Sequence, residues 1–104
     1  MSDVFAALAD PTRREVFALV SYGRAQTATE LAAALPVSRQ AVAKHLAVLQ
    51  SAQLVDAERA GRTTRFHATP EPLSEAIAWM ADVGGRWDAR LERLRAAATE
   101  RGTR

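Results

Sequence analysis

The chain has 104 residues, a length typical of one domain rather than two. It carries 14 Lys and Arg against 12 Asp and Glu, so its formal net charge is only +2. It contains no cysteine, which excludes disulfides, thiolate metal sites and thiol chemistry. The N-terminus does not resemble a signal peptide, and no apolar run approaches the roughly 18 residues of a membrane span. We therefore expect a cytoplasmic protein that has no contact with a membrane.

The charges are unevenly distributed along the chain. Residues 1–36 hold three Arg against four acids, and residues 67–104 balance six basic against six acidic residues. The segment 37–66 holds five basic residues against two acids. Those five are Arg39, Lys44, Arg59, Arg62 and Arg65. An excess of positive charge confined to one segment indicates a localised surface for phosphate.

The composition predicts a thin hydrophobic core. Hydrophobic residues make up 48% of the chain, but aromatic residues only 6%, and alanine supplies much of the hydrophobic total. A small helical chain with so few large apolar side chains often buries part of its apolar surface between subunits. We therefore expect a dimer.

Helix start signals divide the first half of the chain. Asp3 is expected to cap a short helix, and Asp10 followed by Pro11 at the first helical position begins a second, which ends near Tyr22. Residues 27–30 (TATE) have capping-box spacing and begin a short third helix that ends near residue 35. Ser38 begins a fourth helix over about residues 38–52, and the short connection between the last two helices predicts a helix-turn-helix.

The outward face of this fourth helix is unusually small and uncharged. Because each helical residue turns by about 100°, one face is apolar, with Val42, Leu46 and Leu49. The opposite face carries Gln40, Ala43, Lys44 and Ala47. A solvated helix usually carries pairs of Glu and Lys there, yet no acid occurs between Glu30 and Asp56. The face suits the major groove of DNA, although an ordinary Ala-rich surface helix would have the same composition.

A basic hairpin is predicted over residues 54–68. Leu54-Val55 and Thr64–His67 have the pattern of short strands, with a turn at residues 60–62. Arg59, Arg62 and Arg65 occur within seven residues of this segment. A basic hairpin directly after a groove-binding helix suits the DNA backbone or minor groove, whereas isolated exposed arginines commonly serve solubility alone. Both elements together favour a mainly α fold with a small β-hairpin wing, the winged helix-turn-helix, as a single domain over residues 1–104.

The final segment predicts a long helix over about residues 71–98. Its apolar residues follow alternating spacings of four and three, which is typical of a helix that packs along a partner. They are Leu73, Ile77, Met80, Gly84, Trp87, Leu91 and Leu94. Gly84 and Gly85 interrupt this row and permit a kink or close helix approach. Packing within one subunit accounts for part of the row, and a dimer interface is the better explanation for the rest.

Three segments resemble the ArsR/SmtB-type winged-helix repressors. They are FAALADPTRREVFALV (5–20), TATELAAALPVSRQAVAKHLAVLQSAQLV (27–55) and GRTTRFHATPEPL (61–73). The resemblance implies a homodimer joined through the first and last helices and bound to an inverted-repeat operator near its own promoter. It also implies repression that an inducer relieves.

Two departures from this family pattern matter. Metal-sensing members carry Cys in or near the third helix, or His and acids in the last helix, and this chain has neither arrangement. We therefore expect no metal site and no cofactor. The family usually has Gly before the Leu-Val that opens the wing, where this chain has Gln53. In the left-handed conformation that Gly allows there, Gln53 costs roughly 1 kcal/mol.

The candidate site residues form two groups. The expected DNA contacts are Ser38, Arg39, Gln40, Ala43, Lys44, His45, Arg59, Arg62, Thr63, Thr64 and Arg65. The expected dimer contacts are Val4, Phe5, Leu8, Leu73, Ile77, Met80, Gly84, Trp87, Leu91 and Leu94. For His45 a structural role competes with phosphate contact. For Arg13 and Arg14 a structural salt bridge competes with a DNA contact.

The sequence thus predicts a homodimeric transcriptional repressor that binds specific double-stranded DNA. No catalytic motif is present, so we expect no enzyme. One alternative is a ligand-responsive regulator whose small-molecule effector binds near Trp79, Met80 and Trp87. The other is a winged-helix module that binds a protein and uses its basic wing only as surface.

Overall fold

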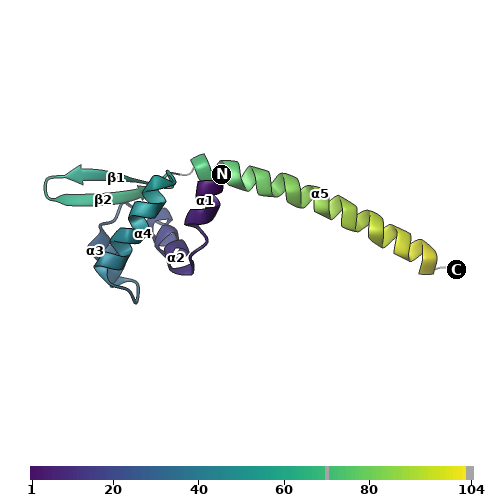
Figure 1. The fold of residues 1–104 in the computed structure, drawn as a ribbon, viewed down its shortest axis with the longest axis horizontal. Helices are drawn as coiled ribbons and strands as arrows, with labels where there is room; N and C mark the ends of the chain where they lie inside the picture. Colours follow the sequence, from purple (N-terminus) through teal and green to yellow (C-terminus); the bar gives the residue numbers. More distant parts are fainter. Residues whose placement is uncertain (70, 103–104) are drawn as a thin grey trace.

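A computed structural model describes residues 1–69 and 71–102. The elements in chain order are α1 (Ser2–Ala7), α2 (Pro11–Ser21), α3 (Ala28–Ala33), α4 (Arg39–Ser51), β1 (Val55–Ala60), β2 (Thr63–Ala68) and α5 (Glu71–Gly102). Helices α1 to α4 and the β-hairpin gather into one body, from which α5 projects (Figure 1). This arrangement confirms the mainly α fold with a hairpin wing.

Three of the predicted helix starts are confirmed by their hydrogen bonds. The Asp10 carboxylate accepts the backbone N–H of Thr12 at 3.3 Å. Thr27 and Glu30 exchange both bonds of the capping box, each at 3.1 Å. Ser38 Oγ accepts the backbone N–H three residues on at 3.1 Å. Each such cap typically contributes about 1 kcal/mol, so these residues fix where α2, α3 and α4 begin.

The prediction that Asp3 caps the first helix is wrong. Helix α1 starts at Ser2, its N-cap is Met1, and no side chain caps it, so Asp3 lies in its first turn. The end of α1 is secured by two arginines of α2. Arg13 donates to the carbonyls of residues 6 and 7, and Arg14 to those of residues 8 and 9. Both arginines therefore bind backbone carbonyls, and neither forms the alternative salt bridge with a described acid.

One hydrophobic core joins the helices to the base of the wing. Its largest fully buried side chains are Val16, Leu31, Val42, Leu46, Leu49 and Leu54. The inward face predicted for α4 supplies three of them, because positions 42, 46 and 49 recur on one side of a helix. Val55 of β1 and Ala76 of α5 close the core from the other side. The outward face of α4 is therefore left free of the core.

Helix α4 ends in a Schellman motif with a left-handed residue. The N–H of Leu54 donates to the carbonyl of Leu49 at 2.9 Å, and that of Gln53 to the carbonyl of Gln50 at 3.0 Å. Leu49 and Leu54, which flank the motif, are both fully buried. Gln53 has a φ of 62°, the conformation anticipated from the missing glycine. The motif turns the chain directly from α4 into the wing.

The wing spans the predicted residues, but its two strands are longer and its turn is tighter than the sequence pattern indicated. Strands β1 and β2 are antiparallel and pair from Val55 with Ala68 to Ala60 with Thr63. Only residues 61 and 62 form the turn, and Gly61 has a φ of 63°, as the first position of a type II′ hairpin turn requires. Phe66 also exchanges two backbone hydrogen bonds with Gln26, at 3.1 and 2.8 Å. This bridge anchors the wing to the segment before α3.

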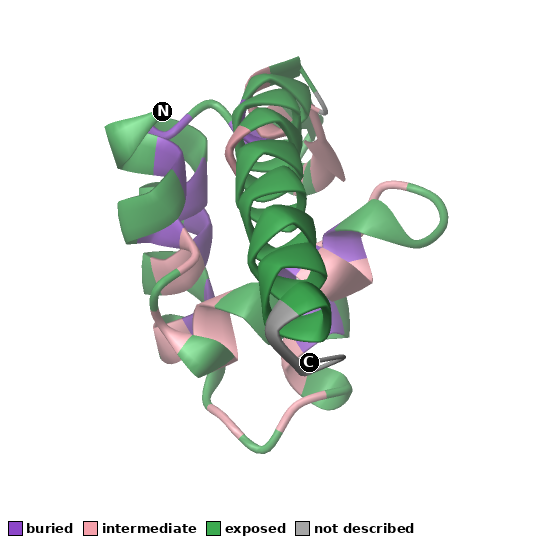
Figure 2. Cartoon of the chain, turned by 90° about the vertical axis from the view of Figure 1, so that its right-hand side faces the viewer, coloured by how far each residue is buried: buried purple, intermediate pink, exposed green. Residues whose placement is uncertain are grey.

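Helix α5 spans 32 residues and ends at Gly102, beyond the predicted end near residue 98. It passes through Gly84 and Gly85 without a break, so the glycines do not end or divide it. From Ile77 to Glu100 every residue is exposed except the half-buried Val83. Figure 2 looks along this helix and shows its exposed surface over nearly its whole length. None of the described helices has the length and apolarity needed to cross a membrane.

The projecting helix makes the chain far from compact. Its principal extents are 74 × 26 × 22 Å and its radius of gyration is 19.8 Å. A compact chain of 100 residues has a radius of gyration of about 13 Å. The outer part of α5 therefore packs against no other described element, although it carries large apolar side chains.

Candidate nucleic-acid interface

The helix-turn-helix presents the outward face of α4 without covering it. Its residues Ser38, Arg39, Gln40, Ala43 and Lys44 are all exposed. In Figure 1 this helix lies beside α3 and the wing, at the end of the molecule opposite to the tip of α5. A helix 13 residues long with small side chains on its outer face can approach the floor of a DNA major groove.

The N-terminal turn of α4 is held against α3 by a side-chain bond. Arg39 Nε donates to Thr29 Oγ1 at 3.1 Å, and both residues are exposed. The contact fixes the guanidinium near the start of α4, where backbone N–H groups and the helix dipole also favour an anion. The other guanidinium N–H groups of Arg39 make no bond within residues 1–69 and 71–102, which leaves them available to a phosphate.

The three wing arginines have different surroundings. Arg65 donates to the Glu30 carboxylate at 3.3 Å and to the carbonyl of residue 25 at 3.4 Å. Arg59 donates to the carbonyl of Gly61 at 3.3 Å within the hairpin itself. Arg62, in the turn, has no hydrogen bond or ion pair with any described residue. Arg65 is thus partly neutralised by Glu30, whereas neither Arg59 nor Arg62 has an acidic partner among the described residues. Arg62 also lacks any hydrogen bond to a described residue.

Glu30 links the wing to the helix-turn-helix. Hydrogen bonds from Thr27 hold the pKa of the Glu30 carboxyl below its ordinary value of 4.5, and the positive charge of Arg65 adds to the effect. The carboxylate therefore stays ionised at neutral pH while it completes the α3 cap and receives Arg65. This contact and the Phe66 bridge to Gln26 together set the angle between the wing and α3.

A hollow of about 410 Å³ lies between α3, α4 and the wing. We call it the wing hollow, and its lining residues are Thr27, Ala28, Thr29, Arg39, Ala43, Arg62, Thr63, Thr64 and Phe66. Its charged residues are two arginines, and no acid belongs to its described lining. Hydroxyl groups supply further hydrogen-bond donors. Two guanidinium groups among hydroxyls form a suitable environment for a phosphate group.

Five of the eleven predicted DNA contacts line the wing hollow, and the other six do not. Arg39, Ala43, Arg62, Thr63 and Thr64 all line the wing hollow. Ser38, Gln40, Lys44, Arg59 and Arg65 lie around it on α4 and the hairpin but do not line it.

Four residues of the wing hollow are not among the predicted contacts, namely Thr27, Ala28, Thr29 and Phe66, and two of them, Thr27 and Thr29, carry hydroxyl groups. The sequence showed Thr27 only as a helix cap. Thr27 also lies next to the wing, and this position depends on contacts between distant segments that no local sequence pattern reveals.

His45 is placed away from this surface. Its Nδ1 lies 3.9 Å from an Asp10 carboxylate oxygen, and its side chain is only 19% exposed. The ring therefore packs between α4 and the start of α2, which supports the structural role over phosphate contact. We do not retain His45 among the proposed DNA contacts.

A second exposed surface lies along α5. Its large apolar side chains include Ile77 (52% exposed), Met80 (46%), Trp87 (56%), Leu91 (43%) and Leu94 (59%). We call this row the apolar stripe. At the root of the helix, Trp79 meets Phe5 of α1 edge to face, with ring centroids 5.8 Å apart. Val4, expected at the interface, is 4% exposed within the core of its own chain, so it offers almost no surface to a partner.

The described residues contain no group of three or more His, Cys, Asp or Glu that could hold a metal ion. Two acid–histidine pairs occur, His45 with Asp10 and His67 with Asp56, each at 3.9 Å. A pair of single contacts is too few for a structural zinc site, which takes four ligands.

Comparisons with known proteins agree on one class. A family model described as a helix-turn-helix domain matches residues 8–58. The transcriptional repressor SdpR of Bacillus subtilis (strain 168) is 30% identical over 88 residues, which cover 85% of this chain and 97% of that protein. The HTH-type transcriptional regulator Rv2034 of Mycobacterium tuberculosis is 43% identical over 68 residues, covering 65% of this chain and 63% of that protein.

Among solved structures, an ArsR-like transcriptional regulator from Rhodococcus sp. RHA1 superimposes with a TM-score of 0.75. It is 40% identical to this chain, and the match covers 93% of this chain and 91% of that one. The similarity thus extends beyond the helix-turn-helix to the wing and to much of the last helix.

Proposed function

Because the chain belongs to the ArsR family of winged helix-turn-helix transcriptional regulators, we propose that it is a homodimeric repressor of an inverted-repeat operator. DNA binding in transcription regulation follows from the family. The observation that carries the finer proposal is the basic surface that α4, α3 and the wing form around the wing hollow, together with the exposed apolar stripe on α5. The name of SdpR as a repressor supports the sign of regulation.

We assign sequence recognition to the exposed face of α4. Gln40 and Lys44 are exposed on the helix beside the wing hollow. The short side chain of Ala43 between them allows the helix to approach the bases closely. An amide such as that of Gln40 pairs with adenine, and a cation such as Lys44 pairs with guanine, in the major groove. Ser38 and Arg39, at the start of the helix, are placed to contact the adjacent backbone.

We assign backbone binding to the wing hollow. A phosphate seated there meets the guanidinium groups of Arg39 and Arg62 and the hydroxyls of Thr27 and Thr29. Arg59, Thr63, Thr64 and Arg65 extend the same basic surface along the hairpin. Contacts of this kind position the protein on DNA without reading its sequence.

We assign the apolar stripe to a second copy of the chain. Helix α5 is about 48 Å long at 1.5 Å per residue, and most of it lies beyond the body of its own chain. The proposed interface residues are Phe5, Leu8, Leu73, Ile77, Met80, Gly84, Trp87, Leu91 and Leu94. A two-fold dimer places its two recognition helices on half-sites about 34 Å apart or somewhat farther, which is one turn of DNA or more.

Selection of bound sequences from a random DNA pool tests this proposal. Recovery of an inverted repeat with two half-sites is the expected result. Enrichment of single half-sites, or no enrichment at all, would contradict it. Repeating the selection with Gln40→Ala should relax the preference at particular bases of each half-site while leaving the spacing unchanged.

Two alternative functions predict different experimental results. A winged-helix module for protein contact predicts weak binding that is equal for all DNA sequences. An effector near Trp79, Met80 and Trp87 predicts that a metabolite both quenches tryptophan fluorescence and releases DNA. The hollow beside Trp87 is small, about 200 Å³, and is otherwise lined by Arg86 and Arg90. The stripe's exposure is explained more simply by dimerisation.

A further inference from the structure

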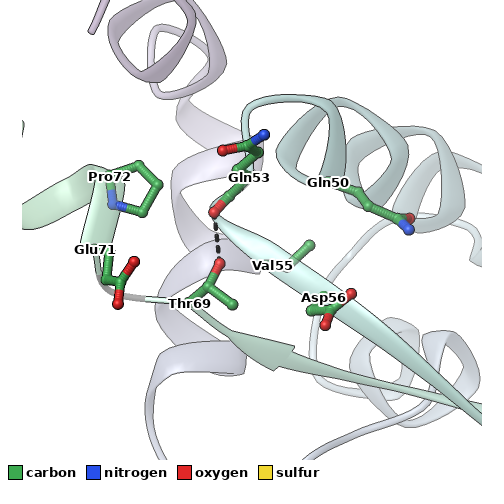
Figure 3. A pocket seen from close by; sticks show the side chains of 7 residues that line it. All are labelled: Gln50, Gln53, Val55, Asp56, Thr69, Glu71 and Pro72. Atoms are coloured by element: carbon green, nitrogen blue, oxygen red, sulfur yellow. Dashed lines mark hydrogen bonds between the residues drawn. The ribbon is translucent and has the colours of Figure 1, made fainter.

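A hollow of about 620 Å³ lies where the end of α4, the start of β1 and the start of α5 meet. Its lining residues are Gln50, Gln53, Val55, Asp56, Thr69, Glu71 and Pro72 (Figure 3). The Thr69 hydroxyl donates to the backbone carbonyl of Gln53 across it and so ties the chain after β2 to the end of α4. This volume is within the range of about 300–1,000 Å³ that holds small molecules.

A second hollow, of about 310 Å³, continues from the first around the start of α5. The two share Gln53, Glu71 and Pro72. The second adds Met1, Asp3, Val4, Ser51, Ala52 and Glu75. We call the combined depression the acidic cleft. It belongs to neither the wing hollow nor the apolar stripe.

The cleft concentrates negative charge in a chain whose net charge is positive. Its described lining contains four carboxylates, those of Asp3, Asp56, Glu71 and Glu75, and no Lys, Arg or His. The α-amino group of Met1 is the single cationic group in that lining. A cleft lined by charges of one sign focuses the field and attracts the opposite charge. Such a surface repels DNA phosphates and attracts cations.

The four carboxylates are not equally engaged within the protein. Asp56 accepts the N–H of Ala57 at 2.9 Å and lies 3.9 Å from His67 Nε2. Glu71 and Glu75 make no hydrogen bond or ion pair with any residue of 1–69 or 71–102. Two acids at the start of α5 thus remain available to a ligand.

Apolar and amide groups lie between the charged ends. In Figure 3, Glu71 and Asp56 lie on opposite sides of the opening, with Thr69 and Val55 between them. Gln50 and Gln53 add amide oxygens, which accept hydrogen bonds from an ammonium group. A ligand that suits this order has ammonium groups separated by an apolar chain.

We propose that the acidic cleft binds an alkylammonium compound, with its cationic groups at Glu71 and Asp56 and its hydrocarbon against Pro72. The site goes beyond DNA binding and does not depend on it. Because the cleft joins the end of the recognition helix, the start of the wing and the start of α5, a ligand there contacts all three elements. By linkage, any effect of the ligand on DNA affinity equals the effect of DNA on ligand affinity.

Isothermal titration calorimetry of the full chain without DNA tests the site. The probes are 1,5-diaminopentane and spermidine in about 0.15 M KCl, which screens non-specific attraction between exposed charges. The neutral analogue 1,5-pentanediol controls for the hydrocarbon. We expect saturable binding of the amines with one site per chain and no binding of the diol.

Three variants locate the site. Glu71→Gln and Asp56→Asn should each weaken amine binding about tenfold, since each removes a charge next to the ligand. Glu15→Gln removes an equal charge from an exposed position on α2 outside the cleft and should change the affinity less than twofold.

Absence of amine binding, equal binding of the diol, or equal weakening by Glu15→Gln would each overturn the proposal. DNA affinity measured on the same preparations is a separate readout. Failure of this site therefore leaves the DNA-binding proposal standing, and failure of DNA binding does not touch the site.

Discussion

Replacing Arg62 with alanine isolates the contribution of the wing to DNA binding. Arg62 lies in the hairpin turn, lines the wing hollow and has no partner among the described residues. Its removal leaves no buried group unpaired and breaks no contact that holds the fold. The change should therefore act on DNA affinity and leave the free energy of unfolding nearly unchanged.

The expected magnitude follows from counting phosphates. Each chain loses one phosphate contact, so a dimer loses two, and the slope of log affinity against log salt should become shallower by about 2. An exposed charge contact contributes about 1 kcal/mol, or about 2 kcal/mol for two, which weakens binding roughly thirtyfold. Because the contact is to the backbone, specific and random DNA should lose affinity by the same factor.

Fluorescence anisotropy at several salt concentrations measures both quantities. Arg93→Ala is the matched control, since it removes the same charge from an exposed position of α5 turned about 200° from Leu91. We expect the control to keep the full salt slope and affinity. An unchanged slope for Arg62→Ala, or a loss confined to one DNA sequence, would refute the assignment of the wing hollow to phosphate.

Three further predictions concern the end of α4, the apolar stripe and the α3 cap. Gln53→Gly should raise the free energy of unfolding by about 1 kcal/mol in urea denaturation, because Gly adopts the positive φ without strain; no gain would mean that strain is absent. In sedimentation experiments the Leu91→Asp variant should be a monomer, while the Arg93→Ala variant should remain a dimer. If both variants are dimers, the apolar stripe is not the dimer interface. The hydrogen bonds from Thr27 lower the pKa of Glu30, so its contribution to stability is complete above pH 4.5 and is lost as the pH falls through the lower folded value. Glu30→Gln should therefore flatten the loss of stability that unfolding experiments measure as the pH falls below 4.5, and an unaltered pH profile would exclude this cap as its source.

Most features set by neighbouring residues could be predicted from the sequence, the exception being the start of α1, where Asp3 does not act as the cap. The caps at Asp10, Thr27 and Ser38 each depend on a side chain and an N–H two or three residues away, and all three are present. The same holds for Gln53, whose left-handed conformation follows from the helix stop it occupies. The inward face of α4 follows from helical periodicity alone.

Features that depend on distant segments could not be predicted. The wing hollow exists because the bridge between Gln26 and Phe66, 40 residues apart, brings the hairpin beside α3. Arg65 lay in a basic pattern that indicated a free cation, and only the fold brings it to Glu30. The row of apolar residues on α5 indicated a contact surface. Val4 of α1 was predicted to belong to the same interface, and its burial within its own chain becomes visible only in the fold.

Titration of the purified protein against its own upstream DNA and a scrambled duplex of equal length tests the central claim most directly. Fluorescence anisotropy at two salt concentrations gives both affinities. We expect salt-dependent binding that prefers the upstream DNA by about 10³ or more, which marks a specific and autoregulatory DNA-binding protein. Equal, weak binding to both duplexes would contradict autoregulation through an operator at that position.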